Sequence, residues 1–395
     1  MLSGGKSLYG AVLALAVFAS LSGSPGAEAK SFKVLHTFRS NDGSEPLGNL
    51  IRDRHDNLYG TTALGGEFNN GAVFKLAPDG TEQVLYSFSF FDGGSPQAGL
   101  VRDAAGNLYG TTEQGSGATC ECGSVFKLAA DGTETVLHAF GNTDGAYPIA
   151  SLIRRGGDFY STTFGGGNES CESGCGVIFR LKTDGGYQVL YSFTGGNDGG
   201  NPTSRLITDS AGNFYGTTEY GGDADAGVIF RLSPNGKYRV LYSFTDGADG
   251  GEPTGNLIKD RAGNLYGTAS GGGISNQNCS RCGTVFKLTP EGTFSVVYSF
   301  TGGNDGAFPR GGLVRTRSGK LFGVTEGGGG TQTCVPLGCG TVFRIAADGT
   351  ETVLHSFTVD DGVNPVTALI DDGRYLYGTA QAGGAGNGTV FIVKK

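Results

Sequence analysis

Three glutamates occupy one position of a repeated segment and could act in acid–base chemistry. Glu113, Glu219 and Glu326 each directly follow a short threonine-containing stretch that is typical of a β-strand. Two carboxyls that converge on a glycosidic bond can serve as general acid and as base or nucleophile. Glutamates at strand ends are more often solvated surface charges. We therefore assign no catalytic residue, and an enzyme built on this chain would use Glu113, Glu219 or Glu326.

Aromatic residues stand close to the same strand ends in the sequence. Rings stack on the C–H faces of sugars while carboxylates accept hydrogen bonds from sugar hydroxyls, so the combination indicates sugar binding. The same rings could instead cover loop backbone, and the absence of Trp weakens the sugar interpretation. The predicted ligand-binding residues are Tyr147, Phe164, Tyr220, Phe308, Glu113, Glu219 and Glu326.

An Asp-Gly-x-x-Pro segment occurs seven times, and its aspartates could offer oxygen ligands to calcium, with Asp198, Asp249 and Asp305 as candidates. An Asp before Gly also caps a turn through backbone contacts, and sevenfold repetition is what a structural role predicts. We therefore expect no metal and no cofactor. The four histidines lie away from the glutamates, in predicted outer strands and one turn, which argues against a Ser-His-Asp triad or a His-ligated metal.

Eight cysteines form four close pairs, each inside an enlarged loop of the repeat. The simplest interpretation is one disulfide per enlarged loop, which restrains the loop in an exported protein. Zinc is the alternative, because neighbouring repeats could combine four thiolates. The Cys-x-Cys pair is the least suited to a disulfide, since bridging it needs a bent backbone. The predicted pairs are Cys120 with Cys122, Cys171 with Cys175, Cys279 with Cys282, and Cys334 with Cys339.

The repeat itself predicts the architecture. Segments resembling V-L-Y-S-F recur at 34–38, 84–88, 136–140, 189–193, 240–244, 296–300 and 353–357. Each repeat contains four short runs rich in β-branched and aromatic residues, which we name strands a to d and which are separated by Gly-rich turns. Examples are strand a at 254–260, strand b at 57–62, strand c at 71–76 and strand d at 84–88. The fold class is therefore all-β, a seven-bladed β-propeller of four-stranded antiparallel blades.

The chain ends predict how the ring closes. The first repeat begins with a strand d at 34–38, and the last ends with a strand c at 388–393. These two segments can pair, so the N-terminal strand completes the last blade and leaves no open edge. Strand alternation then places the b–c loops and the d–a loops on one face, here called the upper face, and the a–b and c–d turns on the lower face. We expect any ligand on the upper face, where the loops vary.

The N-terminus has the features of an export signal. Lys6 precedes an apolar stretch at 8–22, and Ala27-Glu28-Ala29 supplies a small-x-small cleavage site. We expect a signal peptide at 1–29, a single propeller domain at 30–395, and a secreted or periplasmic protein. The formal net charge is −8, which disfavours nucleic acid and anionic lipid as partners. We expect no membrane insertion of the mature chain, and a monomer.

The repeat, with D-x-x-G-N-L-Y-G-T-T followed by G-G and G-x-V-F-K-L, resembles the Gloeo/Verruco ("GloVer") tandem repeat of secreted bacterial proteins. The resemblance covers residues 32–393 and implies a secreted β-propeller, but no reaction. The leading hypothesis is a non-catalytic module that binds a polysaccharide, peptide or protein partner on the upper face. The alternatives are a glycoside hydrolase or lyase that uses Glu113, Glu219 or Glu326, and a structural protein of the cell envelope.

Overall fold

The computed structural model describes residues 31–116, 120–330, 334 and 337–395. The predicted signal peptide at 1–29 lies outside them. Ser31–Lys395 form one compact unit. Within the described part of the chain, no helix has the length and apolar character needed to cross a bilayer.

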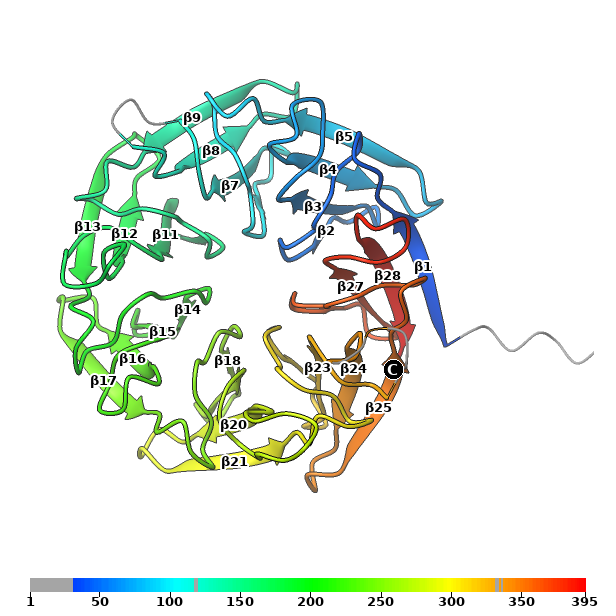
Figure 1. Cartoon of the computed structure of the whole chain (residues 1–395). Helices are drawn as coiled ribbons and strands as arrows, with labels where there is room; N and C mark the ends of the chain where they lie inside the picture. Colours follow the sequence, from blue (N-terminus) through cyan, green and yellow to red (C-terminus); the bar gives the residue numbers. More distant parts are fainter. Residues whose placement is uncertain (1–30, 117–119, 331–333, 335–336) are drawn as a thin grey trace, which may run out of the picture. The chain divides into compact units, whose positions relative to one another are not determined.

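Seven four-stranded antiparallel sheets stand around a central channel, as the sequence predicts (Figure 1). Blades 1 to 6 are β2–β5, β6–β9, β10–β13, β14–β17, β18–β21 and β22–β25, and blade 7 is β26, β27, β28 and β1. The a strands are β2 (Ile51–Arg52), β6 (Val101–Arg102), β10 (Ile153–Arg155), β14 (Ile207–Thr208), β18 (Ile258–Lys259), β22 (Val314–Arg315) and β26 (Ile370–Asp371). The b strands are β3 (Leu58–Thr62), β7 (Leu108–Thr112), β11 (Asp158–Thr163), β15 (Phe214–Thr218), β19 (Leu265–Ala269), β23 (Leu321–Thr325) and β27 (Tyr375–Ala380).

The outer half of each blade consists of strands c and d. The c strands are β4 (Ala72–Leu76), β8 (Ser124–Leu128), β12 (Val177–Leu181), β16 (Val228–Leu232), β20 (Thr284–Leu288), β24 (Thr341–Ile345) and β28 (Thr389–Lys394). The d strands are β5 (Glu82–Ser87), β9 (Glu134–Ala139), β13 (Tyr187–Ser192), β17 (Tyr238–Ser243), β21 (Phe294–Ser299), β25 (Glu351–Ser356) and β1 (Phe32–Thr37).

The ring closes between the first and last strands of the chain. β1 pairs antiparallel with β28, with Phe32 opposite Val393 and Thr37 opposite Thr389. The Lys394 N–H also donates to the Ser31 carbonyl at 2.7 Å. The predicted closure by the N-terminal strand is therefore confirmed.

The a strands are shorter than predicted. The run 254–260 was expected to form one strand, but only Ile258 and Lys259 pair with β19. Nearer the upper face, threonine hydroxyls of strand b contact the next blade instead: the Thr268 hydroxyl donates to the Gly311 carbonyl at 3.2 Å. In this part of the a segment, a side-chain hydrogen bond to the neighbouring blade replaces backbone pairing with strand b. The sequence pattern does not indicate this replacement.

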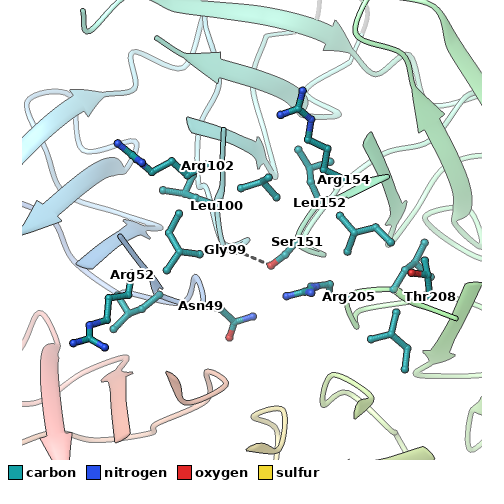
Figure 2. Close-up of a pocket in the computed structure, with 16 residues that line it drawn as sticks. Asn49, Arg52, Gly99, Leu100, Arg102, Ser151, Leu152, Arg154, Arg205 and Thr208 are labelled. Atoms are coloured by element: carbon teal, nitrogen blue, oxygen red, sulfur yellow. Dashed lines mark hydrogen bonds between the residues drawn. The ribbon is translucent and has the colours of Figure 1, made fainter. Parts of the chain in front are cut away.

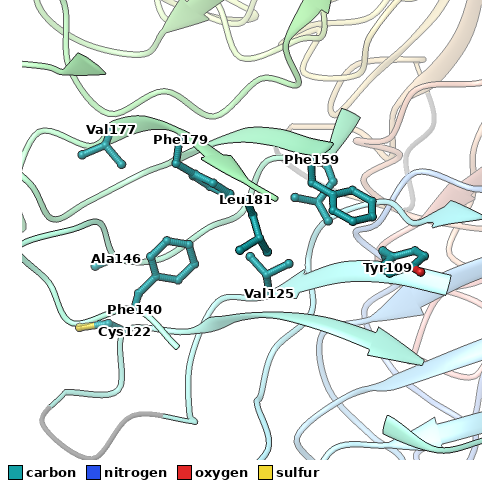
Figure 3. Close-up of a cluster of buried hydrophobic side chains, with 10 residues drawn as sticks. Tyr109, Cys122, Val125, Phe140, Ala146, Phe159, Val177, Phe179 and Leu181 are labelled. Carbon is teal, nitrogen blue, oxygen red and sulfur yellow. The ribbon is translucent and has the colours of Figure 1, made fainter. Parts of the chain in front are cut away.

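The core is a ring of phenylalanine pairs between neighbouring blades. The phenylalanine that follows each strand d meets the central phenylalanine of the next blade's strand c edge-to-face, with centroids 5.0 to 5.4 Å apart. Figure 3 shows one such pair, Phe140 and Phe179, which are both almost fully buried. Edge-to-face geometry is favourable for aromatic rings, so these pairs contribute to fixing each blade against the next.

The glycine of the L-Y-G-T-T motif makes room for that phenylalanine. A Cβ atom at Gly216 would lie 2.6 Å from Phe230 Cζ and 3.0 Å from Leu206 Cδ2. Blade 3 carries Ser161 at this position, where the hydroxyl donates to the Ala150 carbonyl at 3.0 Å.

We expect Gly216→Val to destabilise the protein by about 1–3 kcal/mol through overpacking. Gly216→Ser should cost less, because blade 3 accommodates serine at the same place. Urea unfolding of the two variants and the parent measures the difference. Equal midpoints for the valine variant and the parent would contradict the packing explanation.

Seven short backbone bridges confirm which loops share a face. Each d–a loop pairs with the residues that follow strand b of the same blade, as Gly200 does with Tyr220 and Ala307 with Gly327. Both loop sets therefore lie together on the upper face. On the lower face, cations of one blade stack on rings of the preceding blade: Arg52 on Tyr377, Arg102 on Tyr59, Lys259 on Tyr215 and Arg315 on Tyr266.

Candidate functional site

The residue before each repeated proline forms the backbone of the upper rim. All seven have a positive φ between 50° and 56°: Glu45, Ser95, Tyr147, Asn201, Glu252, Phe308 and Asn364. Side-chain-bearing residues rarely adopt this conformation, and here hydrogen bonds on both sides hold it. The Glu252 N–H donates to the Ala226 carbonyl of the preceding blade, and its own carbonyl accepts from the Ser270 N–H. Each such residue thus presents its side chain from a fixed bridge between two blades.

The predicted glutamates all lie on this rim, but in alternate blades and with different partners. Glu113 of blade 2 accepts hydrogen bonds from Gln97 at 2.6 Å and from Ser95 at 2.9 Å. Glu326 of blade 6 forms an ion pair with Arg310 at 2.6 Å. Glu113 therefore lies apart from the other two glutamates, whereas Arg310 acts on both Glu219 and Glu326.

Glu219 of blade 4 lies at the centre of a polar group formed by three blades. Burial raises the pKa of its carboxyl; the hydrogen bond from Tyr220 and the charge of Arg310 oppose this shift, and the Glu252 carboxylate adds to it. Burial and the neighbouring Glu219 also raise the pKa of Tyr220 to about 12. The Tyr220 hydroxyl is therefore a hydrogen-bond donor at neutral pH, and Glu219 is a carboxyl that gains a proton easily.

Two arginines hold the remaining acids of this group. Arg281 forms ion pairs with Glu252 at 2.8 Å and with Asp246 at 2.6 Å. Arg310 forms an ion pair with Glu326 of the same blade, and its charge also acts to lower the pKa of Glu219 of blade 4. We call this group the blade 4–6 cluster; it comprises Glu219, Tyr220, Asp246, Glu252, Arg281, Arg310 and Glu326. Asp246, Glu252 and the two arginines are not among the predicted site residues. The signal that could have found two of them is that Glu252 and Arg310 are non-repeated residues flanking the repeated Pro253 and Pro309.

The predicted aromatic residues differ in availability. Tyr220 is 39% exposed beside Glu219. Tyr147 and Phe308 are partly buried against the core, and each ring lies over a glycine of the same blade, Gly165 and Gly327 respectively. Phe164 is half-buried, and its carbonyl accepts from the Asn201 amide at 2.9 Å. Covering loop backbone accounts for Tyr147 and Phe308, so Tyr220 is the ring best placed to meet a ligand.

All four predicted disulfides are present. They are Cys120–Cys122, Cys171–Cys175, Cys279–Cys282 and Cys334–Cys339, with Cα–Cα distances of 5.1 to 5.5 Å. The first two border a groove of about 490 Å³ on the upper face, together with Tyr147, Glu169 and Glu172. The disulfides thus shape the loops around the rim.

The calcium candidates are engaged in turns. The carboxylate of Asp198 accepts from the Tyr191 hydroxyl at 2.8 Å and from the Thr194 N–H at 3.0 Å. Asp249 and Asp305 make the same contacts with their own tyrosine and threonine. Within the described residues, one group of three has metal-ligand spacing: His36, Asp42 and Glu82, at the outer edge of blades 7 and 1.

A further cavity lies in the channel rather than on the upper rim. It has a volume of about 610 Å³ and is lined by the a segments of blades 1 to 4 (Figure 2). Asn49, Ser151 and Arg205 point into it. These residues lie outside the upper face, where the sequence pattern predicts a site.

Comparison with known proteins gives a family and a fold. A sequence profile of the Gloeobacter/Verrucomicrobia repeat matches residues 3–195, 116–335 and 280–395. No curated protein matches the sequence.

Three solved structures illustrate the fold similarity. The extracellular domain of a proposed one-component system from B. thetaiotaomicron aligns with a TM-score of 0.58 at 11% identity, over 93% of this chain and 40% of that one. That of a proposed hybrid two-component system from the same organism gives 0.59 at 10% identity, over 92% and 40%. A proposed 6-phosphogluconolactonase from Bacteroides uniformis gives 0.52 at 17% identity, over 82% and 88%.

The chain thus spans about 40% of the length of the first two of these structures. Identities this low show a shared propeller fold and nothing more specific. The repeat profile, in contrast, matches along nearly the whole sequence, and the seven blades correspond to seven copies of the repeat. The chain belongs to the Gloeobacter/Verrucomicrobia repeat family.

Proposed function

We propose that this protein is an exported binding module that holds a polyhydroxylated ligand, such as a polysaccharide segment, on the blade 4–6 cluster. The observation that carries the proposal is Tyr220, a 39% exposed ring on the upper face that directly follows the half-buried Glu219 in the chain. A sugar ring can stack on Tyr220 while its hydroxyls donate to the nearby carboxylates and accept from the arginines.

Rigidity of the rim supports binding at this place. Glu252 is held by backbone hydrogen bonds to two blades, and Arg281 ties its side chain to Asp246. A ligand that meets groups already fixed in position loses less entropy on binding than one that must order a mobile loop.

Export is the second part of the proposal. Four disulfides favour an oxidising compartment, and the sequence of residues 1–29 has the features of a signal peptide. Two of the structures with the same fold are extracellular domains, which agrees with this location.

Tyr220→Ala should weaken binding to the best ligand of a glycan array by about tenfold, because it removes the stacking surface. Phe91→Ala is the matched control, since Phe91 is 90% exposed in a d–a loop on the same face. Its affinity should equal that of the parent. If no glycan binds, if a peptide library supplies the only ligands, or if both variants bind like the parent, the proposed ligand and site are wrong.

A second candidate, glycoside hydrolysis, is favoured by one observation. Glu219 has a raised pKa and stands next to Glu252, which is held in an ion pair. Two carboxyls in contrasting environments are what a general acid and its partner base require. Turnover of the array ligand that Glu219→Gln abolishes, with binding retained, would replace the binding module by an enzyme.

A further inference from the structure

The channel is lined by three tiers of inward-facing residues. Side chains alternate along each a segment, so the first, third and fifth residues after the repeated proline face the channel. The upper tier is Leu47, Gln97, Ile149, Thr203, Thr254, Arg310 and Val366. The middle tier is Asn49, Gly99, Ser151, Arg205, Asn256, Gly312 and Ala368. The lower tier is Ile51, Val101, Ile153, Ile207, Ile258, Val314 and Ile370.

All charged side chains in these three tiers are positive. None of the three tiers contains an aspartate or glutamate, and they contain two cations, Arg205 and Arg310. This contrasts with the formal net charge of −8 for the chain. Arg310 is neutralised by Glu326 at the upper rim. Arg205 is therefore the cation that gives the channel its charge.

The other arginines at the wall of the cavity have different roles. Arg52 and Arg102 stack on tyrosines of the preceding blades, with 5.5 and 5.6 Å from the guanidinium carbon to the ring centre. Arg154 stacks on Phe159 at 5.7 Å. Figure 2 shows all three directed away from the channel centre, whereas Arg205 points towards it.

Arg205 has no counter-ion of its own. Across residues 31–116, 120–330, 334 and 337–395, no hydrogen bond or ion pair reaches its guanidinium, while its backbone N–H donates to the Asn256 side chain at 2.7 Å. Burial within the ring lowers the pKa of the guanidinium. The Arg205 side chain is nevertheless exposed to the channel, so an incoming anion can reach its guanidinium and find a cation that no acid of the described residues pairs with.

The residues around Arg205 indicate the chemical character of the rest of a ligand whose anionic group binds there. Middle-tier neighbours such as Asn49 and Ser151 offer polar atoms, but both side chains already accept backbone N–H groups, from Ala368 and Gly99, at 2.7 and 2.8 Å. Two residues further along the chain, the lower tier is aliphatic, with Ile207 directly below Arg205 in the same blade. Among the described residues that line it, the cavity thus combines the guanidinium of Arg205, which has no protein counter-ion, with an aliphatic wall in about 610 Å³.

We propose that the channel binds a small organic carboxylate with an apolar body, its carboxylate on Arg205 and its body against the aliphatic lower tier. This site is distinct from the blade 4–6 cluster and does not depend on a ligand there. A guanidinium can bind a carboxylate through two parallel hydrogen bonds, and the apolar body gains by leaving water.

Isothermal titration of the mature chain with 4-phenylbutyrate tests the proposal, with 4-phenylbutyramide and inorganic phosphate as comparison probes. The carboxylate should give saturable one-to-one binding. The neutral amide and the phosphate should each bind at least about tenfold more weakly, since one lacks the charge and the other the apolar body.

Arg205→Gln should weaken phenylbutyrate binding at least about tenfold. It should fold like the parent, because the contact with Asn256 involves only the backbone of residue 205. Arg54→Gln, in an exposed a–b turn, is the matched control and should bind like the parent. Ile207→Thr tests the apolar tier separately and should weaken phenylbutyrate without changing the weak affinity for phosphate.

Several results would overturn the proposal. They are no saturable binding of phenylbutyrate, equal affinity for the amide, or unchanged affinity in Arg205→Gln. Phosphate binding as tight as phenylbutyrate would show an anion site without the proposed ligand class. Because none of these probes is a glycan, each outcome is independent of the binding proposed for the blade 4–6 cluster.

Discussion

Deleting residues 31–38 from the propeller domain is expected to leave a chain that no longer unfolds in a single cooperative transition. The deletion removes β1, so the backbone groups of β28 from Thr389 to Val393 lose their partners. It also removes Phe38, which is fully buried against Phe74 of blade 1. Truncating one buried phenylalanine costs about 3–5 kcal/mol, against a total stability of about 5–15 kcal/mol for a typical protein.

A permuted chain provides the control for this deletion. It starts at Arg39 and continues from Lys395 through a two-residue Asp-Gly linker into Ser31–Phe38. Five residues then join the paired positions Val393 and Phe32, the same number as between Leu76 and Glu82 in blade 1. This chain should recover cooperative unfolding, measured by circular dichroism in urea. If the deleted chain unfolds at the midpoint of the parent, the closing strand does not hold the ring.

Repetition explains why the architecture could be predicted from the sequence. A motif such as L-Y-G-T-T imposes the same strand on every blade, and seven copies average out local ambiguity. Closure followed from the order of strands, because the first repeat begins where the last one stops. The disulfides followed from the position of each cysteine pair inside one enlarged loop, and the structure bridges even Cys120 and Cys122, the pair whose spacing is least suited to a disulfide.

The site could be predicted only in part, because side-chain partners come from different blades. The sequence placed Glu219 on the upper rim, but Glu252 and Arg310, which influence it, belong to the next two blades. The pattern also did not separate the exposed Tyr220 from Phe308, whose ring covers Gly327. Arg205 was overlooked because its position in other blades carries small or neutral residues. Such a departure from the repeat is the signal that could have identified it.

Three glutamates at the blade junctions should make the protein less stable as the pH rises towards neutrality. Glu82, Glu134 and Glu351 begin strand d in their blades, and each has a buried oxygen without a hydrogen-bond partner. In the other four blades this position is aromatic and stacks on a ring of the preceding blade, as Tyr238 does on Tyr191 at 4.0 Å. The glutamates occupy the same semi-buried space without that partner.

Burial and, as a smaller cause, a nearby aspartate raise the pKa of each of these carboxyls from 4.5 to about 7. The three aspartates are Asp42, Asp92 and Asp305, respectively. The folded state therefore holds protons that the unfolded chain has released, so folding becomes less favourable as the pH rises from about 4.5 to about 7.

The triple variant Glu82→Gln, Glu134→Gln, Glu351→Gln should be more stable than the parent at pH 8 by about 1 kcal/mol per site, a value reduced for partial solvent exposure. Below pH 4.5 the advantage should vanish, because the parent carboxyls are then protonated in both states. Burial lowers the pKa of His36, which faces Glu82, and Arg344 acts on Glu351; both remain in the variant. The difference in urea midpoint between variant and parent therefore isolates the glutamates.

Glu134→Phe offers an independent check on the same cause. It gives blade 2 the residue that blade 5 carries as Phe294, which stacks on Tyr242 at 3.9 Å. Tyr86 of blade 1 occupies the position equivalent to Tyr242, so the new ring has a partner. Glu291→Gln, in an exposed turn where a threonine hydrogen bond lowers the pKa of the carboxyl, should give no gain at pH 8. A gain for the triple variant that is equal at pH 4 and pH 8 would mean that shape, and not the buried charge, limits the stability of these junctions.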